Sequence, residues 1–150
     1  MGSISSSDKV TTHNIKNIEF VTLKSNGETV QAGFPSPAAD YIENDIDLAA
    51  HLVAKPLSTY LVRVVGESMI EAHIPPEALL IVDKSIIPKN NQIIVAVIDG
   101  DFTVKRLIKN SSGIRLMPAN KAFQPIPITE DMDFRIWGTV TRIIIDAKNV

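Results

Sequence analysis

The stretch that decides the fold reads Ile93-Ile-Val-Ala-Val-Ile-Asp-Gly-Asp-Phe-Thr-Val-Lys-Arg-Leu-Ile108. An Asp-Gly pair between two apolar runs is a strong local signal for a tight hairpin. Residues 93–98 and 102–108 are therefore predicted to be antiparallel neighbours in a sheet.

Further runs rich in Val and Ile lie on both sides of this hairpin, and turn residues bound each of them. These runs predict strands at Tyr60–Val65, Leu79–Val82, Ile114–Pro118 and Phe134–Ile145. Between Asp45 and Lys55 the apolar residues fall at helical spacing, which predicts one short helix that Asp45 caps and Pro56 ends. Six strands and one helix that do not alternate favour a mainly antiparallel β domain over a doubly wound α/β fold.

The composition limits the classes of function. A chain of 150 residues fits one domain plus a tail. Its net charge of −2 leaves no excess of Lys and Arg for a direct grip on DNA, and the absence of Cys excludes disulfides and thiolate sites. No window approaches the roughly 18 apolar residues that span a bilayer, so we expect a cytoplasmic protein without a membrane segment.

The first 30 or so residues are mostly polar and predict a flexible N-terminal arm. The arm leads into Gln31-Ala-Gly-Phe-Pro-Ser-Pro37, where a glycine and two prolines disfavour helix and central strand. An extended, accessible backbone is expected there, which is the form in which proteases bind a chain.

Ser68 is the first candidate for chemistry. Gly66-Glu-Ser-Met-Ile70 follows a predicted strand and precedes a predicted helical turn. A chain reversal at this point would expose the Ser68 hydroxyl and turn nearby backbone N–H groups toward a substrate carbonyl. The alternative is an ordinary turn, because Gly-x-Ser is common in turns and Ile70 stands where a nucleophile elbow has Gly.

Lys105 is the second candidate. Strand alternation places it on one face with Thr103 and Leu107, opposite Val104 and Arg106. Burial would disfavour the ammonium form and provide the neutral amine that a general base needs. The alternative is a side chain that extends to water. A Ser-Lys pair is a known variant of the catalytic triad.

Other chemistry-bearing residues favour structural roles. His13, His51 and His73 lack the spacing of metal ligands, and the hairpin turn accounts for Asp99 and Asp101. No phosphate-binding glycine loop is present, so neither a cofactor nor a metal is predicted.

Four segments together resemble the UmuD branch of the LexA-like self-cleaving serine proteases. They are Gln31–Tyr41, Gly66–Ile70, Leu79–Asp83 and Asp99–Lys105, in the same order and with 37 positions from Ser68 to Lys105. The resemblance runs from about Val30 to the C-terminus and implies a LexA-like fold, with twisted antiparallel sheets forming a partly open barrel.

The resemblance also implies an activity. Ser68 would attack the chain's own Ala32-Gly33 bond, Lys105 would serve as base and then acid, and the backbone N–H groups of Glu67 and Ser68 would form the oxyanion hole. The chain would then divide into an arm, 1–32, and a protease and dimerisation domain, 33–150.

The partners follow from the same resemblance. A UmuD-like protein acts in the SOS response to DNA damage, where its truncated homodimer joins an error-prone DNA polymerase subunit of the UmuC type. RecA filaments on single-stranded DNA would stimulate the cleavage. The residues before the cleavage bond show no helix-turn-helix pattern, so we do not expect a LexA-like repressor of the usual design.

One departure from the family concerns the loop after Met69. The family usually has a glycine-rich stretch and then Gly-Asp, where this chain has Ala72-His73, Pro75-Pro76 and Glu77-Ala78. Two other functions stay open. One is an interaction module with a vestigial Ser-Lys pair, and the other is a signal-peptidase-like enzyme, which would need a membrane segment.

Overall fold

The computed structural model describes residues 10–14, 22–23 and 46–150 of the chain. These residues belong to two compact units. One unit holds Val10–Asn14 together with Lys55–Val150, and the other holds Thr22–Leu23 together with Ile46–Ala54.

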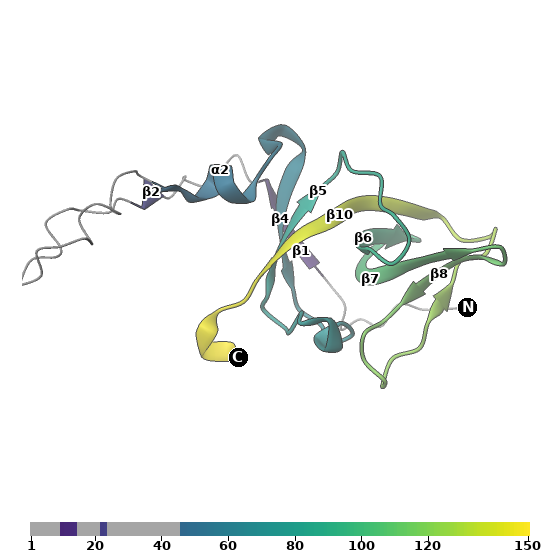
Figure 1. Ribbon diagram of the computed structural model, residues 1–150. Coiled ribbons are helices and arrows are strands. Elements are labelled where there is room, and N and C mark those ends of the chain that lie inside the picture. Colours follow the sequence, from purple (N-terminus) through teal and green to yellow (C-terminus); the bar gives the residue numbers. More distant parts are fainter. Residues whose placement is uncertain (1–9, 15–21, 24–45) are drawn as a thin grey trace, which may run out of the picture. The chain divides into compact units, whose positions relative to one another are not determined.

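The larger unit is built on one sheet of eight strands, in which every pairing is antiparallel (Figure 1). The order across the sheet is β1-β4-β5-β10-β6-β7-β8-β9. The strands are β1 (Val10–Asn14), β4 (Thr59–Val64), β5 (Leu79–Asp83), β6 (Ile93–Ile98), β7 (Asp101–Asn110), β8 (Gly113–Met117), β9 (Ile126–Pro127) and β10 (Phe134–Ile144). The six strands that the sequence predicted are all present, and the mainly β fold class is confirmed.

The predicted hairpin is confirmed as β6 and β7. Ile98 pairs with Asp101, so the loop consists of Asp99 and Gly100 alone. Both residues have positive φ, 49° and 87°, as a two-residue turn of the mirror-image type requires. Because a two-residue turn sets the register, Lys105 stands directly opposite Ile94.

β10 joins the two halves of the sheet. Its first half pairs with β6 and its second half with β5, and register shifts occur between Ile136 and Gly138 and between Val140 and Arg142. Such bulges let a strand bend as it passes from one neighbour to the next. Gly138 allows a close approach there, since a Cβ at this position would lie 2.5 Å from the Val82 side chain.

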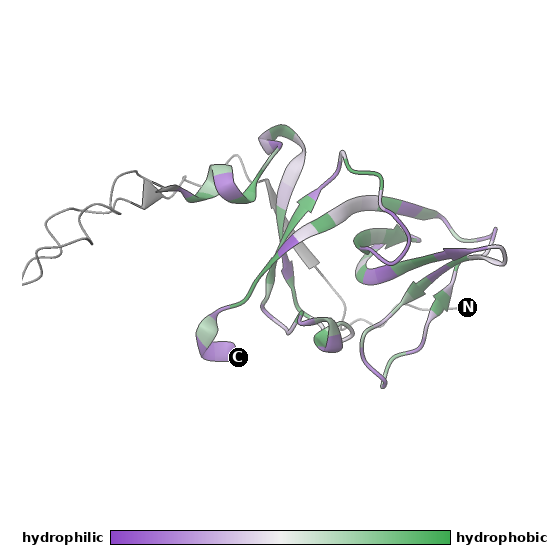
Figure 2. Ribbon diagram, in the orientation of Figure 1, coloured by the Kyte–Doolittle hydropathy of each residue, from purple (hydrophilic) through white to green (hydrophobic). Residues whose placement is uncertain are grey.

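The core lies on both faces of β6. Val95 belongs to one buried cluster with Val104 of β7 and with side chains of β4 and β5. Ile94, Ala96 and Ile98 belong to a second cluster with residues of β7 and β8. A strand that is buried on both faces needs a continuous apolar run instead of alternation, and β6 is hydrophobic along its length in Figure 2.

The short helix begins later than the sequence predicted. α2 (Leu48–Leu52) is capped by Asp47, whose side chain accepts a hydrogen bond from Ala50 N, so Asp45 as the cap was wrong. The reason is local, because β3 (Ile46–Asp47) first pairs with β2 (Thr22–Leu23) in a two-stranded ladder. Pro56 opens the 3-10 turn η3 (Pro56–Ser58). No helix in the described ranges is long and apolar enough to cross a membrane.

Four short strands were not predicted from the sequence, namely β1, β2, β3 and β9. β1 and β2 lie in the segment interpreted as an arm, and β1 forms one edge of the large sheet. The proposed division after Ala32 falls among residues that the structure does not describe.

Candidate active site

Ser68 lies in a turn between β4 and the 3-10 turn η4 (Ile70–Ala72), which confirms the predicted strand-turn-helix context. Its neighbour Met69 is 1% exposed and belongs to the core cluster that contains Val95 and Val104, so the buried Met69 side chain anchors the turn in the core. Ser68 itself is 0% exposed, whereas the sequence predicted that the turn exposes its hydroxyl. That part of the prediction was wrong, because the turn packs into the domain beside Lys105.

Lys105 projects from β7 to the Ser68 turn. Its Nζ donates to Ser68 Oγ at 2.8 Å and to Thr103 Oγ1 at 2.8 Å. The contact with Thr103 confirms the predicted shared face. A third bond joins Lys105 Nζ to the carbonyl oxygen of Val104 at 3.1 Å. The structure therefore brings together the two side chains that the sequence singled out, 37 positions apart.

The surroundings of Lys105 are apolar. Its cross-strand partner is Ile94, and Thr103 stands opposite Ala96, so both side chains rise from the face that carries the second core cluster. Lys105 is only 3% exposed. This burial lowers the pKa of Lys105 from 10.5 to about 7, because the ammonium form loses its hydration. The neutral amine is thus available near neutral pH.

Thr103 has a role that the sequence did not predict. A neutral amine has two N–H bonds and one lone pair, and the carbonyl of Val104 can only accept. When Thr103 Oγ1 accepts the second N–H, the lone pair of Lys105 remains for the hydroxyl proton of Ser68. The signal was present in the sequence, since residue i−2 in a strand lies on the same face.

The segment after β8 (Gly113–Met117) holds the Ser68 turn from the other side. Ala119 N donates to Ser68 O at 2.7 Å, and Glu71 N donates to Ala119 O at 2.7 Å. Asn120 Nδ2 donates to Glu67 O at 2.9 Å. These bonds fix the backbone on both sides of Ser68. No local motif marks Ala119 or Asn120, and sequence reasoning missed both.

The loop after Met69 is the one whose sequence departs from the family pattern. It contains no glycine, yet two of its residues have backbone angles typical of glycine. His73 and Glu77 have φ of 64° and 74°, in the left-handed region that glycine adopts most readily. His73 N–H still closes the turn by donating to Ile70 O at 3.1 Å. Two non-glycine residues of this loop therefore adopt a strained backbone.

A second buried ionisable group lies at the end of β5. Asp83 is 4% exposed, and its Oδ1 accepts bonds from Ser58 Oγ at 2.9 Å and from Ser85 N and Oγ at 2.7 Å. Burial alone would raise the pKa of Asp83, but the Ser85 and Ser58 hydrogen bonds and the charge of Lys55 hold it below its ordinary value. Asp83 therefore stays ionised and joins the η3 turn, which precedes β4, to the end of β5.

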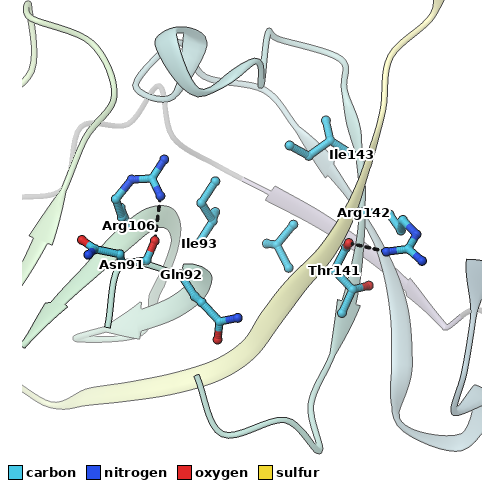
Figure 3. Close-up of a pocket in the computed structure, with 8 residues that line it drawn as sticks. Asn91, Gln92, Ile93, Arg106, Thr141, Arg142 and Ile143 are labelled. Carbon is cyan, nitrogen blue, oxygen red and sulfur yellow. Dashed lines mark hydrogen bonds between the residues drawn. The ribbon is translucent and has the colours of Figure 1, made fainter. Parts of the chain in front are cut away.

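A pocket of about 420 Å³ opens where β10 diverges from β6 (Figure 3). Its lining includes Arg106 and Arg142, whose guanidinium groups do not converge in Figure 3 and instead donate to the Asn91 and Thr141 carbonyls. Ser68 and Lys105 do not line this pocket. Arg106 faces away from Lys105, as strand alternation predicted.

The remaining predicted residues fall into two groups. Asp99 serves the hairpin, since its Oδ1 accepts from Asp133 N at 2.9 Å. Ala32, Gly33 and the side chain of His13 lie outside what the structure describes. Within the described residues, no group of three His, Cys, Asp or Glu residues is placed to hold a metal ion.

Known proteins resemble this chain over most of its length. Residues 24–141 match the family described as Peptidase S24-like. Protein SamA of Salmonella typhimurium is 42% identical over 122 residues, which cover 81% of this chain and 84% of SamA. Protein MucA of Escherichia coli is 39% identical over 120 residues, which cover 79% of this chain and 82% of MucA.

A LexA repressor from Caldicellulosiruptor saccharolyticus is 42% identical over 115 residues, which cover 77% of this chain but 55% of the repressor. The resemblance to the LexA and UmuD proteases that the motifs indicated is thus confirmed over a continuous length of chain. With a buried Ser-Lys contact on a mainly antiparallel β domain, the chain belongs to the Peptidase S24-like family.

Proposed function

We propose that this chain is a UmuD-like, self-cleaving serine endopeptidase of the SOS response that cuts its own Ala32-Gly33 bond. The observation that carries the proposal is the 2.8 Å contact between Lys105 Nζ and Ser68 Oγ, formed by a lysine whose pKa is about 7. A base with this pKa is half deprotonated at neutral pH, so no further activating residue is required.

In the proposed reaction, cleavage proceeds through an ester on Ser68. Ser68 Oγ attacks the carbonyl carbon of Ala32 while its proton passes to Lys105 Nζ. The backbone N–H groups of Glu67 and Ser68 receive the developing oxyanion. Lys105 returns the proton to the departing amine of Gly33, which leaves an ester between Ala32 and Ser68. Lys105 then takes a proton from water as the water oxygen attacks the ester, and it returns this proton to Ser68 Oγ as the C–O bond of the ester breaks.

The arm, 1–32, is removed in this proposal, and the domain, 33–150, remains. The remaining domain forms a homodimer that joins an error-prone DNA polymerase subunit of the UmuC type. RecA filaments on single-stranded DNA stimulate the cleavage. Similarity to SamA and MucA over about four-fifths of each protein supports this assignment.

The test is intact mass after incubation of the pure protein at a series of pH values up to about 10, with Ser68→Ala in parallel. We expect two fragments, one ending at Ala32 and one starting at Gly33, from the wild type only. Gly33→Pro should stop the reaction because the ring changes the backbone at the bond.

Cleavage of Ser68→Ala at the same bond would contradict the role of Ser68. If the wild type stays intact at every pH, RecA filaments on single-stranded DNA are added next. Inertness with the activator would mean that the domain acts only as a binding partner.

A further inference from the structure

Two successive residues of the segment after β8 hold the two peptide groups that flank Ser68. Ala119 N donates to Ser68 O at 2.7 Å, and Asn120 Nδ2 donates to Glu67 O at 2.9 Å. The first bond fixes the peptide group between Ser68 and Met69, and the second fixes the peptide group between Glu67 and Ser68. One short segment of chain therefore orients the backbone on both sides of the nucleophile.

The bond from Asn120 sets the direction of a backbone N–H. A peptide group is planar and trans, so its C=O and its N–H point in opposite directions. The group that contains Glu67 O also contains the N–H of Ser68. By holding Glu67 O on one side, Asn120 aims the Ser68 N–H to the other side. That N–H is one of the two donors proposed above for the oxyanion.

The amide of Asn120 is itself held in one orientation. Its Oδ1 accepts from Ala122 N at 2.9 Å, and its backbone oxygen accepts from Phe123 N at 3.0 Å. The first of these bonds is typical of an Asn that opens a turn. With Oδ1 engaged, Nδ2 is the end of the amide that points to Glu67, so the donor is in place before any reaction begins.

The same segment is attached to the strands that carry the base. Met117, the last residue of β8, pairs with Arg106 of β7, which directly follows Lys105 (Figure 1). Asn120 stands three positions beyond Met117. The Ser68 turn and Lys105 are therefore both held by the β7–β8 pair. This arrangement keeps the nucleophile, the base and the Ser68 N–H in a constant geometry.

A need to satisfy Glu67 O does not account for the Asn120 bond. Glu67 and the bond itself are exposed, so water can replace the amide at little cost in stability. Glu67 O also accepts from Ile70 N at 3.4 Å. What water cannot supply is a fixed direction for the peptide group. Oxyanion donors are effective because they are oriented before the charge develops.

We propose that Asn120 is a positioning residue, which aligns the Ser68 N–H with the oxyanion that forms during self-cleavage. The inference rests on the proposed self-cleavage and adds one residue to it. Asn120 acts only through the Glu67–Ser68 peptide group. Loss of a whole oxyanion donor slows serine proteases by about 10²–10³-fold, so loss of its alignment should slow cleavage by at least about tenfold.

The test compares Asn120→Ser with Asn110→Ser in the full-length chain. Asn110 is the matched control, because its Oδ1 accepts from Ser112 N at 2.9 Å in the same kind of turn, at the end of β7. A serine hydroxyl replaces the acceptor in either turn but is too short to replace the Nδ2 donor. At about pH 9, the first-order cleavage rate should fall at least about tenfold in Asn120→Ser and stay within about twofold in Asn110→Ser.

The pH profile distinguishes a misaligned N–H from a disturbed Ser-Lys pair. In Asn120→Ser the plateau of the rate should fall, while the midpoint of the profile stays at the Lys105 pKa of about 7. In the Ser68→Ala background, both variants should have similar midpoints of urea unfolding. A wild-type rate in Asn120→Ser, a shifted pH midpoint, or a rate loss that follows the unfolded fraction would overturn the inference.

A second measurement does not depend on cleavage. Lys105→Met stops the proposed reaction but keeps Ser68, and in this background NMR signals of the Glu67 carbonyl carbon and the Ser68 amide report the orientation of their peptide group. Both signals should shift with Asn120→Ser and stay in place with Asn110→Ser. Unchanged signals would contradict the role of Asn120. A wild type that stays intact even with RecA filaments would instead contradict the proposed self-cleavage.

Discussion

Asp83 and Lys105 are both buried in the same domain, yet Asp83 keeps its charge whereas Lys105 tends to lose it. Asp83 collects three hydrogen bonds on one oxygen and keeps its charge. Lys105 loses hydration, and its pKa falls to about 7. Asp83 keeps its charge because hydrogen bonds and a nearby cation offset its burial, whereas desolvation dominates at Lys105 and makes its amine a base near neutral pH. The difference separates a structural group from a chemical one without reference to any motif.

The largest expected effect comes from removing the titrating amine. Lys105→Arg keeps a positive charge but stays protonated at every accessible pH, so cleavage should slow by at least about a thousandfold. In the wild type the rate should rise about tenfold per pH unit below pH 7 and level off above it, following the neutral fraction of Lys105. Rates from intact mass between about pH 5 and pH 9 check both statements. A flat profile would contradict Lys105 as base.

The second effect is on stability. Because the folded chain lowers the pKa of Lys105 from 10.5 to about 7, the unfolded chain binds more protons between these values. The Lys105 contribution to the free energy of unfolding therefore rises by about 1.4 kcal/mol per pH unit across this window. Lys105→Met should be more stable than wild type by about 4 kcal/mol at pH 7, and the gap should close above pH 10.5.

Urea unfolding at a series of pH values measures this gap, with Ser68→Ala as the background in both chains to prevent cleavage. A gap that stays constant with pH would mean that the amine is not desolvated in the folded chain.

The third effect tests the hydrogen bonds that stabilise the charge of Asp83. Asp83→Asn keeps the shape and one acceptor oxygen but loses the charge, so each of the three bonds becomes weaker. We expect a loss of about 2–3 kcal/mol in the free energy of unfolding at pH 7. The folded pKa of Asp83 is lowered, so its contribution is complete above the ordinary Asp pKa and disappears as the pH falls through the folded value.

Asp101→Asn is the matched control, because that carboxylate is exposed at the start of β7. An Asp83→Asn variant that is as stable as this control would show that the Ser58 and Ser85 bonds contribute nothing.

The smallest effect concerns the orientation of the base. Thr103→Val keeps the volume but removes the acceptor for one Lys105 N–H, so cleavage should slow by about tenfold. Thr103→Ser should restore most of the rate because it restores the hydroxyl. Single-turnover cleavage of all three chains at one pH measures the effect. Loss of rate in Thr103→Ser as large as in Thr103→Val would indicate packing as the cause.

Local sequence signals made much of the fold and of the candidate site predictable. The Asp99-Gly100 turn gave the hairpin and its register, and through alternation it placed Lys105 with Thr103. The contact with Ser68 was predicted through the family resemblance. The contacts that the sequence did not reveal join residues that are far apart along the chain. Ser58 reaches Asp83 across 25 positions and Asn120 reaches Glu67 across 53, and neither pair has a local pattern.

The short strands β1 and β9 were not predicted for a different reason. β1 reads VTTHN and β9 reads IP, and neither has the alternation or length by which a strand is recognised. They exist because neighbouring strands offer unpaired backbone groups. The helix cap moved from Asp45 to Asp47 in the same way, since pairing with β2 takes the residues before it.

The position of β10 at the middle of the sheet has a consequence for synthesis. β10 is the last strand that the structure describes, yet it separates β5 from β6, which end at Asp83 and Ile98, well before β10 begins at Phe134. On the ribosome, the apolar strands β5 and β6 must therefore each keep an open side until β10 has left the exit tunnel. The sheet closes in one late step between strands distant in sequence, which makes folding slow and makes chaperones valuable to the nascent chain.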